Sequence, residues 1–237
     1  MSDKQRIIIK LSGEALSNGN TKAIDPEKVR LIAKEVKAAY DLGNLQIGII
    51  VGGGNIWRGK IASEMGMERS SADYMGMLAT ILNALALQNA IEELGIETRT
   101  MTSLNIPQVA EPYIRRKAIS NLDKDRVVIF GGGTGNPYFS TDTTSALRAA
   151  EIGAKRILMA KNGTDGVYNK DPRKHADAIK YESLSHHQVL ELGLEVMDST
   201  AAALCKDNGI EIVVFDMNVA GNIAKVAAGE KLGTWIY

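Results

Sequence analysis

The sequence predicts an α/β fold, a three-layer α/β/α sandwich with a mostly parallel central sheet. Short apolar, β-branched runs alternate along the chain with longer segments whose apolar residues recur at helical spacing. No internal repeat, low-complexity run or linker interrupts this alternation. Because strands that alternate with helices form parallel sheets covered on both faces, we expect one domain over 1–237. Within it, an N-terminal lobe of about 1–152 meets a C-terminal lobe of about 153–237.

Several runs have the length and composition of buried strands. They are 7–11, 46–51, 98–101, 126–130, 156–160, 211–215 and 234–236, the last expected at an edge of the sheet. The expected helices are 27–42, 74–94, one opened by Glu111-Pro112, 143–152, 199–207 and 222–228. The first of these helices follows Asp25-Pro26, a pair that favours a helix start.

The predicted helix 74–94 is apolar on nearly all sides, so most of its surface must be covered. Either the rest of the fold or a second subunit covers it. The longest apolar stretch, 75–87, is shorter than a membrane span, and no secretory signal precedes the first strand. We therefore expect a cytoplasmic protein that does not enter a membrane.

Composition argues against several functional classes. Lys plus Arg and Asp plus Glu number 28 each, so the net charge is zero and no general basic field attracts nucleic acid. The single Cys205 excludes an internal disulfide or a multi-cysteine metal site, and its apolar surroundings predict a buried, inert thiol. His175, His186 and His187 lie in a polar stretch without a completing carboxylate. We expect these histidines to be solvated, and we expect no metal site made by the protein alone.

Glycine-rich polar loops follow three of the predicted strands, at 10–15, 52–59 and 131–142. Glycine lets backbone N–H groups approach an anion, and parallel sheets bind ligands at the carboxyl ends of their strands. Ordinary tight turns also need glycine. Three such loops in one sheet favour phosphate binding over turn chemistry alone.

Neither familiar phosphate motif is complete. Gly54 and Gly59-Lys60 have P-loop spacing, but Ile61 stands where the metal-binding serine or threonine belongs. In the third loop, Asn136 replaces the last glycine of the dinucleotide fingerprint. A phosphate site of another architecture is therefore required.

The segment 160–172 carries groups that suit a nucleotide. Its strand delivers Lys161 and Asn162, and Tyr168 and Asp171 follow after a glycine turn. Positive charge suits phosphate and a flat ring suits a base, while the alternative is a polar turn with a stray aromatic. Lys10 also ends a buried strand. Two lysines at one sheet edge suit phosphoryl transfer, which needs positive charge more than covalent catalysis.

Three further side chains have both a functional and a structural explanation. Asp142 follows Ser140 at a helix start, where a simple N-terminal cap is the plainer interpretation. Asp73 opens the predicted helix 74–94, either as a cap or as an acceptor for ribose hydroxyls. Arg58 follows a glycine loop and is either a phosphate clamp or a surface arginine.

Motifs spread over nearly the whole chain point to one family. They are Lys10 to Glu14, Gly52 to Asn55, Asp73 to Thr80, Thr134 to Asp142 and Asp165 to Tyr168. In order and spacing they resemble the bacterial uridylate kinase branch of the amino acid kinase family. The elements Met-Gly-Met-Leu-Ala-Thr and Thr-Gly-Asn-Pro are the most specific, because they separate this branch from relatives that phosphorylate amino acids.

The resemblance implies ATP-dependent phosphorylation of UMP to UDP in pyrimidine nucleotide biosynthesis, with Mg²⁺ accompanying ATP. It implies a homohexamer built as a trimer of dimers, with the helix 74–94 at the dimer interface, and regulation by GTP as activator and UTP as inhibitor. UMP is expected in the N-terminal lobe and ATP in the C-terminal lobe. The resemblance makes Lys10, Lys161 and Asp142 the catalytic group, in which Asp142 holds two lysines that neutralise the moving phosphoryl.

The resemblance also assigns binding residues. By motif match, the ATP side is lined by Lys10, Leu11, Ser12, Gly13, Gly54, Arg58, Asn162, Tyr168 and Asp171. The UMP side is lined by Gly53, Asp73, Thr134, Gly135, Asn136, Pro137, Tyr138, Phe139, Ser140 and Thr141. Two alternatives remain. One is a kinase of the same fold that acts on carbamate, an amino acid or an isoprenoid phosphate, against which the segment 134–141 argues. The other is a non-catalytic protein that stores nucleotides or oxoanions, against which the retained lysines argue.

Overall fold

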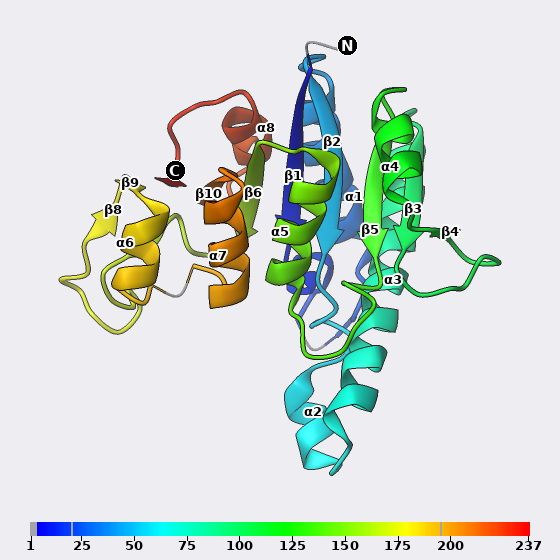
Figure 1. Cartoon of the computed structure of the whole chain (residues 1–237), viewed down its shortest axis with the longest axis horizontal. Helices are drawn as coiled ribbons and strands as arrows, with labels where there is room; N and C mark the ends of the chain where they lie inside the picture. The colour runs from blue at the N-terminus through cyan, green and yellow to red at the C-terminus, as the bar shows by residue number, and fades with distance from the viewer. Residues whose placement is uncertain (1–3, 20, 195) are drawn as a thin grey trace.

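The computed structural model describes residues 4–19, 21–194 and 196–237. Its centre is a sheet of nine strands in the order β4-β3-β5-β2-β1-β6-β10-β11-β9 (Figure 1). The strands are β1 (Gln5–Leu11), β2 (Leu45–Val51), β3 (Thr98–Thr102), β4 (Glu111–Pro112), β5 (Val127–Gly131), β6 (Arg156–Lys161), β9 (Ser183–Leu184), β10 (Glu211–Asp216) and β11 (Thr234–Ile236). Every neighbouring pair is parallel except β10 with β11. The predicted α/β class with a mostly parallel sheet is confirmed.

Helices cover both faces of the sheet, as predicted (Figure 1). One face packs under α1 (Pro26–Tyr40), α3 (Arg69–Glu92) and α8 (Asn222–Ala227). The other face packs under α4 (Arg115–Leu122), α5 (Thr141–Ile152), α6 (His186–Glu191) and α7 (Ser199–Asp207). Two short helices, η1 (Gly13–Leu16) and α2 (Gly59–Glu64), follow β1 and β2.

Side-chain alternation along β1 connects the sheet to these two layers. Ile7, Ile9 and Leu11 belong to the core under α1 and α3, whereas Ile8 belongs to the core under α5. Successive side chains of a strand point to opposite faces. Lys10 is therefore in phase with Ile8 and lies on the α5 side of the sheet.

Two expectations about the sheet edges are wrong. Glu111 and Pro112 form the edge strand β4 instead of opening a helix, and the helix begins at Arg115. Proline fits an edge strand because it donates no hydrogen bond to a neighbour. The strand Thr234–Ile236 is not at the edge, because β9 pairs with its free side. The segment between β6 and α7 also contains a small hairpin, β7 (Val167–Tyr168) with β8 (Lys180–Tyr181), which the sequence did not predict.

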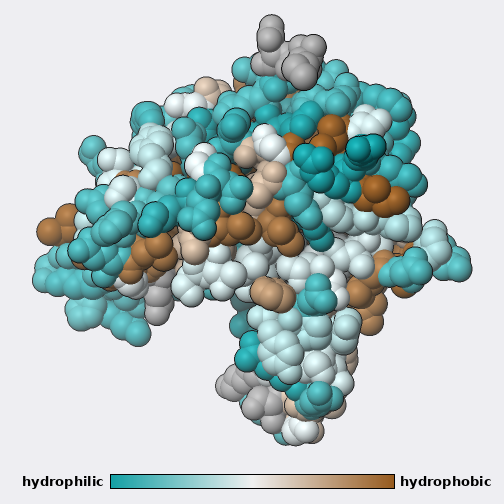
Figure 2. All heavy atoms as spheres, in the orientation of Figure 1, coloured by the Kyte–Doolittle hydropathy of each residue, from teal (hydrophilic) through white to brown (hydrophobic). Residues whose placement is uncertain are grey.

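The long helix α3 is only half covered by its own chain. Its buried face includes Met77, Ile81 and Ala84, but Tyr74, Leu78 and Leu82 are 43%, 48% and 52% exposed. These three lie at intervals of four residues and so share one face of the helix. The N-terminal part of α3 projects from the body together with α2 (Figures 1 and 2). Among the described residues, α3 is the one helix long and apolar enough to cross a membrane, and half of that stretch is buried within the fold.

The histidine prediction is correct in two cases and wrong in one. His175 and His187 are exposed, but His186 is buried at the start of α6, and burial lowers the pKa of its imidazole. Cys205 is buried as predicted, and burial raises the pKa of its thiol to about 12. A thiol with so high a pKa stays protonated at neutral pH and is a poor nucleophile.

Candidate functional site

Two lysines meet at the carboxyl end of the sheet because of strand register. β1 and β6 are adjacent and parallel, and Lys10 pairs with Met159. Met159 and Ile157 lie in the core under α5, so Lys161, two residues after Met159, points to that same face. Lys10 and Lys161 therefore emerge side by side at one end of the sheet, below the start of α5.

Asp142 completes this group from the first turn of α5, which faces the two lysines. Its Oδ1 atom lies 2.7 Å from Lys10 Nζ, and the two side chains are 20% and 12% exposed. This buried oxygen has no well-angled hydrogen bond among the described residues, so the contact with Lys10 is an ion pair. Ser140 caps α5 by accepting hydrogen bonds from the Asp142 and Thr143 backbones. The simpler interpretation of Asp142 as the cap is wrong, which leaves its carboxylate free to face the lysines.

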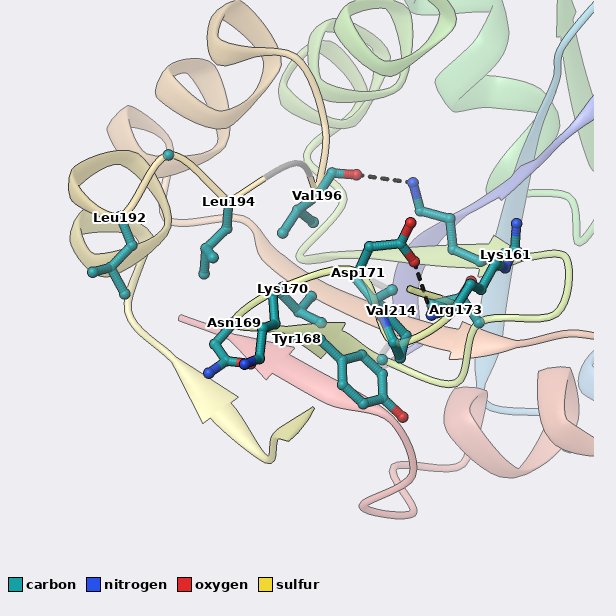
Figure 3. Close-up of a pocket in the computed structure, with 15 residues that line it drawn as sticks. Lys161, Tyr168, Asn169, Lys170, Asp171, Arg173, Leu192, Leu194, Val196 and Val214 are labelled. Carbon is teal, nitrogen blue, oxygen red and sulfur yellow. Dashed lines mark hydrogen bonds between the residues drawn. The ribbon is translucent and has the colours of Figure 1, made fainter. Parts of the chain in front are cut away.

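Lys161 is held differently. Its ammonium donates a hydrogen bond to the Val196 carbonyl at 2.9 Å, a neutral partner (Figure 3). Burial, and then the positive charge of Lys10, lower the pKa of Lys161, while Asp142 acts in the opposite direction. The positive charge of Lys161 is only partly balanced by negative charge from the protein, so a polyanionic ligand would be a favourable partner for it.

A segment just after Val196 ties the start of α7 to the start of α5. Asp198 caps α7 by accepting from the Ala201 backbone, and it also accepts from Thr143 Oγ1 at 3.0 Å. A further hydrogen bond joins it to Ser140. The first turn of α5 is thus fixed against the segment whose carbonyl holds Lys161. No sequence motif marked Asp198.

A cavity of about 490 Å³ opens beside Lys161 (Figure 3). Tyr168 and Asp171, both predicted on the ATP side, line it. The Tyr168 hydroxyl donates to Asp165 at 2.7 Å, which raises the pKa of Tyr168, and Asp171 accepts from the Arg173 backbone at 3.0 Å. Thr164, Gly166, Val167, Asn169, Lys170 and Pro172 also line it, and they lie in the segment 160–172 that the sequence singled out without assigning each residue. The sequence missed the rest of the lining, which consists of Arg173, Leu192, Gly193, Leu194, Val196 and Val214. Apolar walls with one aromatic ring and a cation suit a nucleoside attached to phosphates.

A second cavity, of about 430 Å³, brings together Gly54, Arg58 and Asn162, which the sequence also put on the ATP side. Arg58 donates to the Gly54 carbonyl at 2.9 Å and forms an ion pair with Glu14. The arginine is therefore a surface residue that contacts the glycine loop, and its role as a phosphate clamp stays a prediction. It is exposed but already directed at the glycine loop.

The three residues after Lys10 do not line these cavities with side chains. Leu11 is fully buried in the core, where its carbonyl accepts from the Gly52 backbone. Ser12 caps η1 by accepting from Glu14, and Gly13 is buried against the Gly52 carbonyl. The backbone of this segment and the hydroxyl proton of the half-buried Ser12 remain available to a ligand.

A third cavity, of about 170 Å³, lies on the other side of Gly54. Five residues predicted on the UMP side line it, namely Gly53, Asp73, Phe139, Ser140 and Thr141. The remaining lining residues were not predicted there, and they are Trp57, Gly59, Ala72, Gly76, Met77, Thr80, Gly133 and Thr144. Thr134, Gly135, Asn136, Pro137 and Tyr138, also predicted there, lie in the adjoining loop and outside the lining.

Asp73 fastens that loop. It lies inside α3, which begins at Arg69, so the cap interpretation is wrong. Its Oδ2 atom accepts from the Tyr138 backbone at 2.8 Å, and the Arg69 guanidinium lies 5.1 Å from the Tyr138 ring centroid. Tyr138 has φ of +72°, a left-handed conformation that is strained for a bulky residue.

No described group of three or more His, Cys, Asp or Glu side chains is arranged to hold a metal ion. A divalent cation at this site would therefore need most of its ligands from water and phosphate oxygens. Mg²⁺ commonly binds in this way.

The amino acid kinase family model matches residues 5–216, which include Lys10, Lys161, Asp142 and the three glycine-rich loops. The chain belongs to the amino acid kinase family. Within that family, it is 58% identical over 232 residues to a uridylate kinase of Limosilactobacillus reuteri, covering 98% of this chain and 96% of the relative. It is 56% identical, with the same coverage, to a uridylate kinase of Pediococcus pentosaceus.

Solved structures agree with this placement in the amino acid kinase family. The UMP kinase of Ureaplasma parvum superimposes with a TM-score of 0.94 at 40% identity, covering 98% of both chains. The UMP kinase of Bacillus anthracis gives a TM-score of 0.95 at 39% identity, covering 98% of this chain and 95% of its own. The predicted resemblance to uridylate kinases is confirmed.

Proposed function

We propose that this protein transfers the γ-phosphoryl group of ATP to UMP, giving UDP and ADP. The observation that carries the proposal is the 56–58% identity, over nearly the full length of both partners, to proteins named uridylate kinase. Kinases of the same fold for carbamate, amino acids or isoprenoid phosphates are not favoured by these relatives, nor is a non-catalytic storage protein.

The site geometry supports the same reaction. We infer that ATP occupies the cavity beside Tyr168 and Lys161, with its phosphates extending toward Gly54 and Arg58. UMP would occupy the small cavity beside Asp73. Gly54 lines the proposed phosphate cavity on one side and the proposed UMP cavity on the other, so the triphosphate of ATP and the single phosphate of UMP would meet at this loop.

In the proposed reaction, a phosphate oxygen of UMP attacks the γ-phosphorus of ATP. A bond forms between them, while the bond from that phosphorus to the β–γ bridging oxygen breaks and its electron pair leaves with ADP. The UMP phosphate is already anionic at neutral pH, so no general base is needed. Lys10 and Lys161 would neutralise the oxygens of the moving group, and Asp142 would hold Lys10 in place.

We propose Mg²⁺ as the divalent cation. When bound with ATP it would shield the phosphate charges and orient the β- and γ-phosphates. The donor set fits such an ion, because the described residues near the phosphates offer isolated carboxylates and not a cage.

We further propose a cytoplasmic homohexamer built as a trimer of dimers, acting in pyrimidine nucleotide biosynthesis. The exposed face of α3, with Tyr74, Leu78 and Leu82, is suited to pack against a second copy, which would bury apolar surface now in water. Activation by GTP and inhibition by UTP rest on the family resemblance alone.

The test is direct. Purified protein with ATP and Mg²⁺ is supplied in turn with UMP, CMP, AMP, carbamate and acidic amino acids, and ADP release is followed together with ³¹P NMR of the product. UDP formed from UMP with the highest kcat/KM is expected. Faster phosphorylation of carbamate or an amino acid would overturn the proposal.

A further inference from the structure

The buried face of α3 holds two of the three glycine-rich loops through two side chains that have no role in the proposed phosphoryl transfer, although Thr80 also lines the proposed UMP cavity. Thr80 and Asn83 are 4% and 0% exposed, although both are polar and lie within an apolar helix. Buried polar groups persist where they are hydrogen-bonded. Each of these two bonds to a different loop.

Asn83 fastens the loop after β2. Its Nδ2 group donates to the Gly52 carbonyl at 2.7 Å and to Asn55 Oδ1 at 2.7 Å, while its Oδ1 accepts from Asn55 Nδ2 at 3.0 Å. Asn55 Nδ2 also donates to the Ala23 carbonyl at 2.7 Å. Gly53 and Gly54, between these anchored ends, line the proposed UMP cavity. The amide of Asn83 therefore fixes both ends of the segment that would face the phosphates.

Close packing reinforces this anchor. A Cβ atom on Gly53 would lie 2.8 Å from the Gly76 carbonyl oxygen and 2.9 Å from the Ala79 Cβ atom, both on α3. Real Cβ atoms do not approach so closely, so the loop lies directly on the helix backbone. A shift of the loop relative to α3 would break several contacts at once.

Thr80 fastens the loop after β5 in a similar way. Its Oγ1 atom accepts from the Gly132 backbone at 2.9 Å and donates to the Met77 carbonyl at 2.6 Å. Gly132 has φ of +75°, a conformation open to glycine. Gly133, the next residue, lines the UMP cavity. Thr80 thus holds the left-handed turn that carries Gly133.

We propose that Asn83 and Thr80 are positioning residues, which set the two glycine loops at the distance needed for phosphoryl transfer. This inference rests on the proposed function. Asn83 would act on the loop after β2, which would face the phosphates of both ATP and UMP. Thr80 would act on the loop after β5, which would face UMP. Phosphoryl transfer depends on placing the reacting groups accurately, so small displacements of these loops should reduce catalysis in a fully folded enzyme.

The experiment compares Asn83→Leu and Thr80→Val with wild type, each far below its unfolding temperature. Asn83→Leu removes the amide but keeps the number and branching of the side-chain heavy atoms, and we expect kcat to fall by about tenfold or more. Thr80→Val removes the hydroxyl, and we expect KM for UMP to rise severalfold while KM for ATP stays within about twofold. Thr80→Ser, which restores the hydroxyl, should recover most of the affinity for UMP.

Two controls on the same helix separate positioning from stability. Leu87→Ala removes a fully buried apolar side chain one turn beyond Asn83, and Asn89→Ala removes an exposed amide that, among the described residues, donates to Glu93. Leu87→Ala should lower the unfolding temperature but should neither lower kcat, as Asn83→Leu does, nor raise KM for UMP, as Thr80→Val does. Asn89→Ala should change neither property.

The inference is overturned if Asn83→Leu, folded and no less stable than Leu87→Ala, turns over like wild type. It is equally overturned if Thr80→Val raises both KM values alike. Should Asn83→Leu fail to fold, the KM comparison for Thr80→Val decides. A wild type that forms no UDP would instead refute the proposed function, so the two failures are distinguishable.

Discussion

Replacement of Lys10 by alanine tests the proposed site most sharply. Its ammonium is paired with Asp142 at 2.7 Å and is 12% exposed, so it acts in partly desolvated surroundings. Two unit charges about 4 Å apart at an effective dielectric constant of about 20 interact by ~4 kcal/mol. Removal of one preorganised donor from a transition state costs about 10²–10³ in kcat, or ~2.7–4 kcal/mol. We therefore expect kcat of Lys10→Ala to fall by about 10²–10³.

Stability provides a second, independent readout of the same change. Without Lys10, the buried Asp142 Oδ1 atom loses its ion-pair partner, which should lower the free energy of unfolding by ~1–3 kcal/mol. The double variant Lys10→Ala/Asp142→Asn removes the stranded charge, so stability should largely return. Its kcat should stay low, because the missing ammonium acts on the phosphoryl group.

The measurements are steady-state kinetics at saturating ATP and UMP, and urea unfolding of each variant. Lys10→Arg keeps the charge and serves as the matched control, with a smaller loss of kcat. A folded Lys10→Ala enzyme with kcat within about threefold of wild type would refute the assignment, since a direct transition-state contact costs more than that. Recovery of kcat in the double variant would show instead that Lys10 only neutralises Asp142.

Four other predictions concern separate parts of the molecule. Asp73→Ala should raise KM for UMP with little change in KM for ATP, and an unchanged KM for UMP would mean that Asp73 only fastens the Tyr138 loop. Because the pKa of Lys161 is lowered, the alkaline fall of kcat/KM should begin at a lower pH than the titration of an ordinary lysine. Lys161→Arg should abolish this alkaline fall. Leu78→Asp, on the exposed face of α3, should reduce the mass seen by analytical ultracentrifugation without unfolding the chain, whereas an unchanged mass would argue against that interface. The pKa of His186 is lower in the folded state than in the unfolded chain, so the free energy of unfolding should decline as pH falls from about 6.5 toward the pKa of the folded state. His186→Gln should remove that decline, as measured by thermal unfolding at several pH values.

The central part of the fold was predictable because the relevant strands are long and apolar. The β1, β2, β5, β6 and β10 runs each carry buried β-branched residues, and the predicted bounds differ from the observed ones by at most two residues, within ordinary assignment scatter. The convergence of Lys10 and Lys161 followed from the same rule, since parallel strands in one sheet end at one edge. The face of the sheet that the two lysines share could be assigned only from the structure, because it depends on the register between β1 and β6.

The C-terminal segment between β6 and α7 was not predictable by the same reasoning. Strands of two residues, such as β7, β8 and β9, are too short to show a period of two. The apolar wall at Leu192, Leu194 and Val196 carries no motif, and only the tertiary fold brings this segment between α6 and α7 to the cavity. The edge strand at Glu111-Pro112 was mistaken for a helix start because proline favours both positions.

Polar residues inside the apolar helix α3 were missed for a related reason. In sequence, Thr80 and Asn83 only interrupt a hydrophobic run, and their partners lie on loops far away in the chain. The specific Met-Gly-Met-Leu-Ala-Thr element ends at Thr80, so the sequence marked this residue as characteristic of the family but did not show what its hydroxyl binds. The structure supplies the mechanism by bringing Gly132 to that hydroxyl.

The two lysines are held unequally, and this difference suggests how substrate binding prepares the site. Lys10 has a carboxylate partner, whereas Lys161 has a neutral carbonyl and a lowered pKa. A bound triphosphate would supply the negative charge that Lys161 lacks and would raise its pKa again. The alkaline limb of kcat, which reports the enzyme with bound substrates, should then lie at higher pH than the limb of kcat/KM, which reports the free enzyme. Coincident limbs would mean that the phosphates do not approach Lys161, and the proposed position of ATP would have to be abandoned.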